Sequence, residues 1–216
     1  FKRLASVVDD PEGLSLITRY RYDANGNMRY QYDPKGYYVE FTYDSLNRKT
    51  EHIQHKGTGN LITRYTAYDP EGNLMEMIDP NGQPFTYAYD ELNRQIDSYY
   101  PDVASPFNKI VRIHKVYDPN NNVTEITETK TGPHNSTIVD TTVNHYDNFD
   151  RLDDSTQRGL TIDYGYDANG NRVQVSTPSG TTNYAFDSRN RIKTAAADGL
   201  ATVYLYYPDG KRDEVC

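Results

Sequence analysis

The residues best suited to chemistry in this sequence stand in a short word, Tyr-Asp-Ala-Asn-Gly-Asn, which occurs at 22–27 and again at 166–171. Carboxylate and amide oxygens at alternate loop positions are ligands that a hard cation such as Ca²⁺ prefers. An EF-hand loop also needs a bidentate Glu at its twelfth position. In three words of this kind that position is proline: Pro34 counted from Asp23, Pro80 from Asp69 and Pro178 from Asp167. The EF-hand hypothesis therefore fails, a looser cation site stays open, and we expect no metal and no cofactor.

Turn formation accounts for every residue of the word. Asp can accept hydrogen bonds from backbone N–H groups in an Asx-turn. Pro, at the position after Asp in some words, has a φ fixed near the value that the turn needs, and Gly and Asn tolerate the positive φ of a tight hairpin. The Tyr before the word is expected at a strand end, with its ring packed on neighbours and its hydroxyl in water. The words are therefore predicted to be hairpin corners.

Other residues with catalytic or ligating side chains lack a spacing that fits a known site. His52 and His55 precede a loop-like segment and are predicted to be exposed polar residues. Adjacent carboxylates, as at Asp153 and Asp154, point to opposite faces of a strand and do not form a glycosidase pair. The remaining histidines, expected on strand or loop surfaces, are His114, His134 and His145. The sequence has no nucleophile elbow, no phosphate-binding Gly-rich loop with Lys and no His-Glu-x-x-His, so we expect no enzymatic activity.

Composition limits both the core and the partners. Apolar residues make up 36% of the 216 residues, and 21 of them are Tyr, against 6 Phe and no Trp. Aliphatic side chains for a two-layer core are scarce, and burial must depend largely on tyrosine rings. A net charge of -8 offers no basic surface for nucleic acid or an anionic membrane. The single Cys216 excludes an internal disulfide framework, and glycosylation at Asn122 or Asn135 is left open.

The turn words recur along the whole chain and define a repeat. Segments that begin with Tyr-Asp and a turn word align from Tyr22, Tyr68, Tyr117 and Tyr166, and a fifth begins near Tyr207. Short runs rich in Tyr, Val, Ile and Thr separate the words, which is typical of β-strands. We therefore predict an all-β fold of antiparallel β-hairpin repeats over residues 1–216, with no separate catalytic domain.

The repeat-motif residues are the ones to which we assign a structural role. They form the Tyr-Asp, Gly-Asn or Asn-Arg dipeptide of a word, or its equivalent. In order along the chain they are Tyr22, Asp23, Gly26, Asn27, Tyr43, Asp44, Asn47, Arg48, Tyr68, Asp69, Gly72, Asn73, Tyr89, Asp90, Asn93, Arg94, Tyr117, Asp118, Tyr146, Asp147, Tyr166, Asp167, Gly170, Asn171, Phe186, Asp187, Asn190 and Arg191.

Both ends of the chain lie inside the repeat pattern. Residues 1–4 resemble the end of a Leu-Asn-Arg word, and residues 207–210 resemble the start of another. Capping units, which arrays of repeats need at their ends, are not recognisable there. We therefore expect an excerpt of a longer array. The first ten residues lack the apolar region of a signal peptide, although a signal can lie upstream.

The ordered series of Tyr-Asp-x-x-Gly-Asn and Tyr-Asp-x-Leu-Asn-Arg words resembles the tyrosine-aspartate (YD) repeat of the Rhs family over essentially the whole chain. The resemblance implies a ribbon of hairpins that coils into a shell, as a β-solenoid-like wall. In bacterial Rhs proteins and insecticidal toxin-complex components such a shell encloses a C-terminal toxin. In animal teneurins a similar barrel belongs to an adhesion receptor. The self-cleaving signature of the family is not matched.

These observations predict a structural repeat module of a large secreted or cell-surface protein, forming part of a shell around a C-terminal polypeptide toxin. The alternatives are an adhesion module that binds glycans or proteins, and an extracellular fibre that assembles from copies of itself. Expected partners are neighbouring repeats of the same chain, and beyond them an enclosed toxin, glycans or further copies. No contact with nucleic acid and no membrane insertion are expected of this segment.

Overall fold

The computed structural model describes residues 3–9, 13, 16–57, 59–101, 109–132 and 136–215. All regular secondary structure in this part of the chain is β-strand, and within each unit consecutive strands pair antiparallel, so the prediction of an all-β fold of hairpin repeats is confirmed. The search of the described residues for a helix able to cross a membrane finds none. The chain divides into two compact units, residues 1–105 and 106–216. The prediction of one continuous repeat region stays a prediction.

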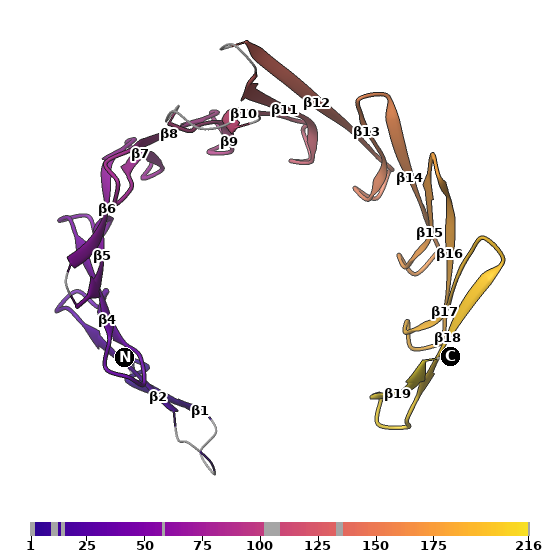
Figure 1. Ribbon diagram of the computed structural model, residues 1–216, viewed down its shortest axis with the longest axis horizontal. Coiled ribbons are helices and arrows are strands. Elements are labelled where there is room, and N and C mark those ends of the chain that lie inside the picture. The colour runs from indigo at the N-terminus through magenta and orange to yellow at the C-terminus, as the bar shows by residue number, and fades with distance from the viewer. Residues whose placement is uncertain are drawn as a thin grey trace. The chain divides into compact units, whose positions relative to one another are not determined.

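In its described residues the first unit is a meander of nine strands, each paired with the next (Figure 1). The strands are β1 (Ser6–Asp9), β2 (Leu16–Tyr22), β3 (Met28–Tyr32), β4 (Tyr38–Tyr43), β5 (Lys49–Lys56), β6 (Gly59–Tyr68), β7 (Leu74–Ile78), β8 (Pro84–Tyr89) and β9 (Gln95–Tyr99).

The second unit continues the same design with ten strands, again paired in chain order. They are β10 (Lys109–Tyr117), β11 (Val123–Thr131), β12 (Thr137–Tyr146), β13 (Leu152–Gln157), β14 (Leu160–Tyr166), β15 (Arg172–Thr177), β16 (Gly180–Phe186), β17 (Ile192–Ala197), β18 (Leu200–Tyr206) and β19 (Arg212–Val215).

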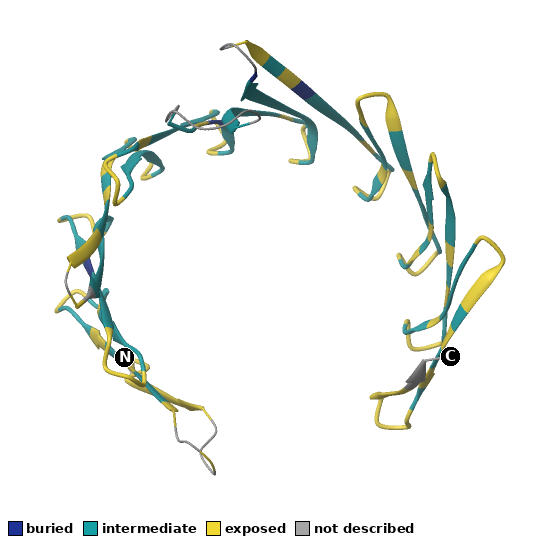
Figure 2. Ribbon diagram, viewed as in Figure 1, coloured by how far each residue is buried: buried dark blue, intermediate teal, exposed yellow. Residues whose placement is uncertain are grey.

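Within each unit the described strands form a single layer, so most side chains are half-buried (Figure 2). Phe41, at 8% exposure, is the one apolar side chain in the described ranges that is buried. No second layer covers either face of the described strands, so few side chains can be fully buried. This agrees with the low aliphatic content of the sequence. Hydroxyl pairs across strands take part of the place of apolar contacts, such as Thr42 with Thr50 at 2.7 Å and Thr156 with Thr161 at 2.8 Å.

The two edges of the meander use different turns. Along one edge, loops of five residues join the strands at the corners that begin with Asp23, Asp44 and their equivalents. On the opposite edge of the first unit, the turns that begin with Asp33 and Asp79 have the same length. Along the opposite edge of the second unit, tight hairpins include Arg158-Gly159 and Asp198-Gly199, with φ of 52° and 76° in the first and 50° and 80° in the second. Two successive positive φ values are the geometry of a type I′ turn, whose twist matches that of the flanking strands.

A shift in strand register precedes the corner tyrosines. It falls between Arg21 and Tyr22 and between Thr42 and Tyr43, and it recurs between Gly165 and Tyr166. Such an irregularity redirects the next side chain. The tyrosine hydroxyl then reaches across the neighbouring strand and donates a hydrogen bond to a backbone carbonyl.

Where the preceding corner is described, the acceptor is the first residue after it. The bonds run from Tyr22 to Leu4 (2.9 Å), Tyr43 to Met28 (2.8 Å), Tyr68 to Lys49 (2.5 Å), Tyr89 to Leu74 (3.1 Å), Tyr146 to Val123 (3.0 Å), Tyr166 to Leu152 (2.9 Å) and Tyr206 to Ile192 (2.8 Å). The expectation that these hydroxyls stay in water is therefore wrong. The carbonyl next to each corner needs a donor, and the redirected tyrosine supplies it.

Phe186 occupies the place of a corner tyrosine but has no hydroxyl. By the rule above, its acceptor would be the carbonyl of Arg172, the first residue of β15. We predict that Phe186→Tyr raises the free energy of unfolding by about 0.5–1.5 kcal/mol, the net value of one such hydrogen bond. Urea unfolding followed by circular dichroism measures the change.

Two matched variants complete this test. Tyr166→Phe removes an existing bond of the same kind and should lower the free energy of unfolding by a similar amount. Tyr184→Phe removes a hydroxyl that makes no hydrogen bond within the described residues and should be nearly neutral. A destabilised or unchanged Phe186→Tyr protein would contradict the rule.

Candidate functional site

The aspartate of each Tyr-Asp word organises its corner. At Asp44, one carboxylate oxygen, Oδ1, accepts the N–H groups of Leu46 and Arg48, both at 2.9 Å. The other oxygen, Oδ2, accepts Nε of Arg48 at 2.8 Å. Backbone bonds close the loop, from Asp44 N to Arg48 O and from Asn47 N to Asp44 O. One carboxylate thus satisfies donors that the five-residue loop would otherwise leave open.

Corners of two kinds alternate along this edge, according to the fifth residue. In the first kind, Asn donates its side-chain amide to Oδ2 of the aspartate at 2.9–3.0 Å: Asp23 with Asn27, Asp69 with Asn73, Asp118 with Asn122 and Asp167 with Asn171. In the second kind, Arg donates Nε at 2.7–2.8 Å: Asp44 with Arg48, Asp90 with Arg94, Asp147 with Arg151 and Asp187 with Arg191.

Each Asn corner is joined to the Arg corner that follows it. The same Asn amide that binds its own aspartate also donates to the fourth residue of the next corner. These bonds are Asn27 to Asn47 at 2.8 Å, Asn73 to Asn93 at 2.7 Å, Asn122 to Asp150 at 2.8 Å and Asn171 to Asn190 at 2.9 Å. The acceptor residues have φ between 57° and 61°, a conformation that Asn and Asp adopt more readily than most residues.

Three of the Arg corners in turn contact the next tyrosine. The guanidinium of Arg48 lies 4.8 Å from the ring centre of Tyr68, that of Arg151 lies 4.5 Å from Tyr166, and that of Arg191 lies 4.2 Å from Tyr206. Such cation–π contacts contribute about 0.5–1 kcal/mol at exposed sites. Within each unit the corners therefore form a continuous side-chain row, which we call the corner row.

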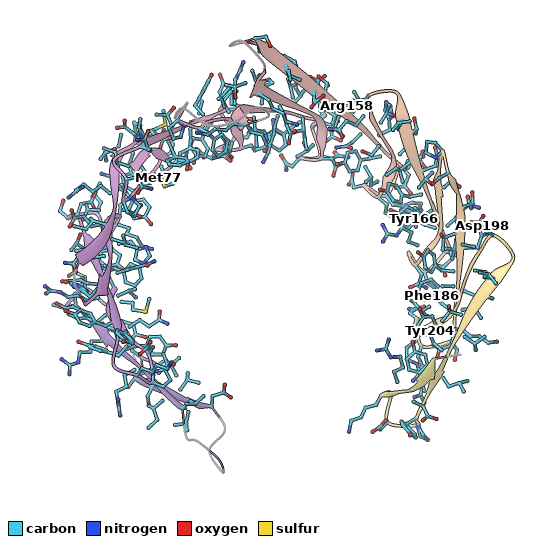
Figure 3. All side chains as sticks on the ribbon, in the orientation of Figure 1. Met77, Arg158, Tyr166, Phe186, Asp198 and Tyr204 are labelled. Carbon is cyan, nitrogen blue, oxygen red and sulfur yellow. The ribbon has the colours of Figure 1, made fainter. Side chains whose placement is uncertain are left out.

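All 28 repeat-motif residues lie at corners or at the strand ends that enter them. Figure 3 labels Tyr166 and Phe186, which hold equivalent places in front of successive corners. At the end of the second unit, Tyr207 takes the first corner position and Tyr206 takes the place of the corner tyrosine. The expected start of a fifth unit near Tyr207 is thus at Tyr206 in the structure.

The histidines of β5 are not exposed polar residues, and that prediction is wrong. His52 stacks on Phe41 with 5.0 Å between ring centres, and His55 stacks on Tyr38 at 4.2 Å. Strand alternation sends them to opposite faces, where aromatic neighbours cover them. Burial, followed by the charge of Lys49, lowers the pKa of His52.

The remaining histidines and the other candidate residues from the sequence do not come together in a site within the described residues. His114 is half-buried in β10, and His145 is exposed in β12, 2.9 Å from Asp154. In the described ranges no group of three or more His, Cys, Asp or Glu side chains is arranged to hold a metal. Both oxygens of Asp118 and the amide of Asn122 are engaged in a corner. His134, Asn135 and Cys216 lie outside the described residues.

An ion cluster in the second unit had not been anticipated. Asp140 on β12, at 6% exposure, accepts Nε of Arg158 at 2.6 Å and Nζ of Lys130 at 2.9 Å. Arg158 and Lys130 hold the pKa of Asp140 well below its usual range. The three residues are distant in the sequence, and only the strand register brings them together. Gly159 indicates a turn after Arg158, but nothing in the sequence pairs Arg158 with Asp140.

The corner row should make the protein sensitive to acid. Hydrogen bonds from the Arg191 side chain and then from its backbone N–H lower the pKa of Asp187 to about 2. A carboxylate with a folded pKa below its unfolded value of about 3.9 stabilises the fold above that value. We therefore expect the melting temperature to fall as pH is lowered from about 5 to about 2, in thermal unfolding followed by circular dichroism.

Two aspartate variants distinguish the loss of a corner carboxylate from the loss of one negative charge elsewhere. Asp187→Asn should lower the melting temperature at pH 7 and weaken the acid dependence. Asp198→Asn, in a two-residue hairpin outside the corner row, should leave both nearly unchanged. An identical acid profile for all three proteins would contradict the assignment.

The Asp140 cluster gives a separate prediction. Asp140→Asn removes the carboxylate that Arg158 and Lys130 share, and it should lower the melting temperature at pH 7. Asp163→Asn, on an exposed position of β14, is the matched control and should be neutral. Equal melting temperatures for both variants would mean that the cluster does not stabilise the unit.

The RHS Repeat family model matches residues 68–102 and 166–203. Each matched segment begins at a corner tyrosine, Tyr68 in the first and Tyr166 in the second. The comparison with curated proteins gives no match.

Solved structures with the same fold come from toxin complexes. TcdB2-TccC3 without its hypervariable C-terminal region aligns with a TM-score of 0.69 at 20% identity, over 93% of this chain and 12% of that chain. TcdB2-TccC3-Cdc42 gives 0.69 at 19% identity, over 97% and 13%. A Tc holotoxin pore of Photorhabdus luminescens with a mutated TccC3 gives 0.63 at 18% identity, over 91% and 13%.

At these identities the structural similarity establishes the fold, and the chain spans only 12–13% of the length of the matched chains. The family match adds sequence evidence in both units. Together with the ordered series of corners, it supports the similarity of this structural repeat module to the YD-repeat proteins of the Rhs family.

Proposed function

We propose that this chain is a segment of the wall of a larger secreted or cell-surface protein, and that the wall encloses a polypeptide encoded after the repeats. The observation that carries the proposal is the corner row. Each added hairpin brings its own aspartate, its own link to the next corner and its own tyrosine bond. Extension of such a sheet does not depend on a growing apolar core, which suits a thin wall of any length.

The polar character of the strands supports a container for polypeptide. Cross-strand pairs of hydroxyl groups lie in both units, including Thr42 with Thr50, and Ser176 with Thr181 at 3.0 Å. A face of this kind offers few large apolar areas to which an unfolded chain would adhere. The similarity to structures of toxin-complex components favours a toxin as the enclosed polypeptide.

We further propose that this segment has no enzymatic activity of its own. A catalytic carboxylate needs a free oxygen within reach of the substrate. The corner aspartates that bind a fifth-position Asn or Arg accept hydrogen bonds on both oxygens, for example Asp147 from Arg151 and Asp167 from Asn171. Their depressed pKa values make them poor proton donors near neutral pH.

Protease protection in the full-length protein tests the enclosure. The complete reading frame is expressed, and the purified protein is treated with proteinase K under native conditions, with fragments identified by mass spectrometry. We expect a segment C-terminal to residue 216 to survive while the wall is intact. The same segment, expressed alone, is the control and should be degraded at once if it is unfolded.

Two results would contradict the enclosure. The first is a downstream segment cleaved as fast in the full-length protein as on its own. The second is a reading frame that ends shortly after residue 216. Electron microscopy of the same sample then distinguishes the alternatives, because a fibre would appear as filaments and a container as closed particles.

A further inference from the structure

Two arginines of β2, Arg19 and Arg21, differ from most other arginines of the first unit. Both are exposed, and neither forms an ion pair or a hydrogen bond within the described residues. The paired arginines of this unit contact acids at 2.7–3.4 Å: Arg29 with Glu40, Arg48 with Asp44, Arg64 with Glu51 and Arg94 with Asp90. Since a guanidinium stays charged in proteins, β2 carries two positive charges that no described acid neutralises.

Both guanidinium groups belong to the same face of the sheet. Side chains two positions apart on a strand point the same way, with about 6–7 Å between their Cα atoms. The register places Arg19 opposite Tyr32, so Tyr32 belongs to this face as well. Cζ of Arg21 lies 5.4 Å from the ring centre of Tyr32. This contact orients the guanidinium of Arg21 and leaves its N–H groups available to a ligand.

A cavity of about 400 Å³ lies beside the two guanidinium groups. Small ligands occupy cavities of about 300–1,000 Å³. The lining includes no acidic side chain among the described residues, and it consists of Ala5, Arg19, Tyr20, Arg21, Tyr32 and Gly36. The cavity therefore combines two free cationic groups with tyrosine side chains, which is a suitable environment for an anion that carries an organic group.

We propose that this cavity binds the phosphate group of a small organic phosphate. A phosphate monoester near neutral pH has a charge of about -1.5 to -2 and three strong acceptor oxygens. A guanidinium donates two parallel hydrogen bonds to a pair of such oxygens. Three oxygens can therefore serve Arg19 and Arg21 together, and the organic group then lies beside Tyr20.

Other ligand classes fit these groups less well. A carboxylate has two oxygens and one charge, so a bidentate bond to one arginine would leave the other without a partner. A cation would be repelled by both arginines. The net charge of -8 opposes any anion at long range. Exposed charges further apart than about 8 Å are largely screened at physiological ionic strength, so the adjacent arginines dominate the interaction.

Substitutions at the two arginines test the site. Arg19→Gln and Arg21→Gln each remove one guanidinium and keep a polar side chain. We expect each to weaken phosphate binding about tenfold or more, the loss that follows when hydrogen bonds between charged groups disappear. Arg21→Lys keeps the charge but not the planar fork, and it should bind with an affinity between those of Arg21→Gln and the unaltered protein.

Isothermal titration calorimetry with phenyl phosphate, in a buffer free of phosphate, measures binding by the full chain. Benzoate is the matched probe, because it has the same ring with a carboxylate in place of the phosphate group, and we expect it to bind at least tenfold more weakly. Arg64→Gln removes one exposed arginine of β6 outside the cavity. It is the matched control and should bind phenyl phosphate as the unaltered protein does.

Three outcomes would overturn the proposal. They are no binding of phenyl phosphate at millimolar concentration, equal affinity for phenyl phosphate and benzoate, and equal binding by the unaltered protein and both glutamine variants of β2. Melting temperatures of all variants are measured alongside. A variant that loses binding at an unchanged melting temperature locates the loss in the cavity.

Discussion

The carboxylate of the corner aspartate is the interaction on which the rest of this structure depends. A single-layer sheet exposes both faces and cannot be held by an apolar core, and only Phe41 among the described apolar side chains is buried. Strand pairing and the bonds within the loop backbone leave the N–H groups of the third and fifth loop residues without partners, as at Leu46 and Arg48. The aspartate fills that need, with one oxygen for the loop backbone and the other for the fifth side chain. The loop thereby becomes a rigid joint between two strands.

Cooperation between corners follows from the alternation of Asn and Arg at the fifth position. Asn is short and reaches the fourth residue of the next corner, as Asn73 reaches Asn93. Arg is long and covers the next tyrosine ring, as Arg48 covers Tyr68. Each bond is worth about 1 kcal/mol or less at a partly exposed site. The corner row stabilises the sheet because these weak bonds repeat regularly along one edge. In other repeat proteins, too, each unit stabilises its neighbour.

Much of this architecture could be predicted from the sequence, because the corners are local. The spacing of Asp, Gly and Asn in one word defines a turn without reference to distant residues, and the strands between words are recognisable from Tyr, Val, Ile and Thr. Contacts between words could not be predicted in the same way. The tyrosine hydroxyls were expected in water because the register shift before Tyr43 or Tyr166 leaves no mark in the sequence. His52 and Asp140 were missed for the same reason, since their partners lie on neighbouring strands.

Where the fifth residue of a corner is Asn or Arg, both oxygens of the corner aspartate accept hydrogen bonds. Hydrogen exchange by mass spectrometry tests the central role of the corners most directly. The amides of Arg48, Arg94, Arg151 and Arg191, which donate to the corner aspartates, should exchange as slowly as amides in the middle of strands. Exchange as fast as in an unstructured loop would contradict the account.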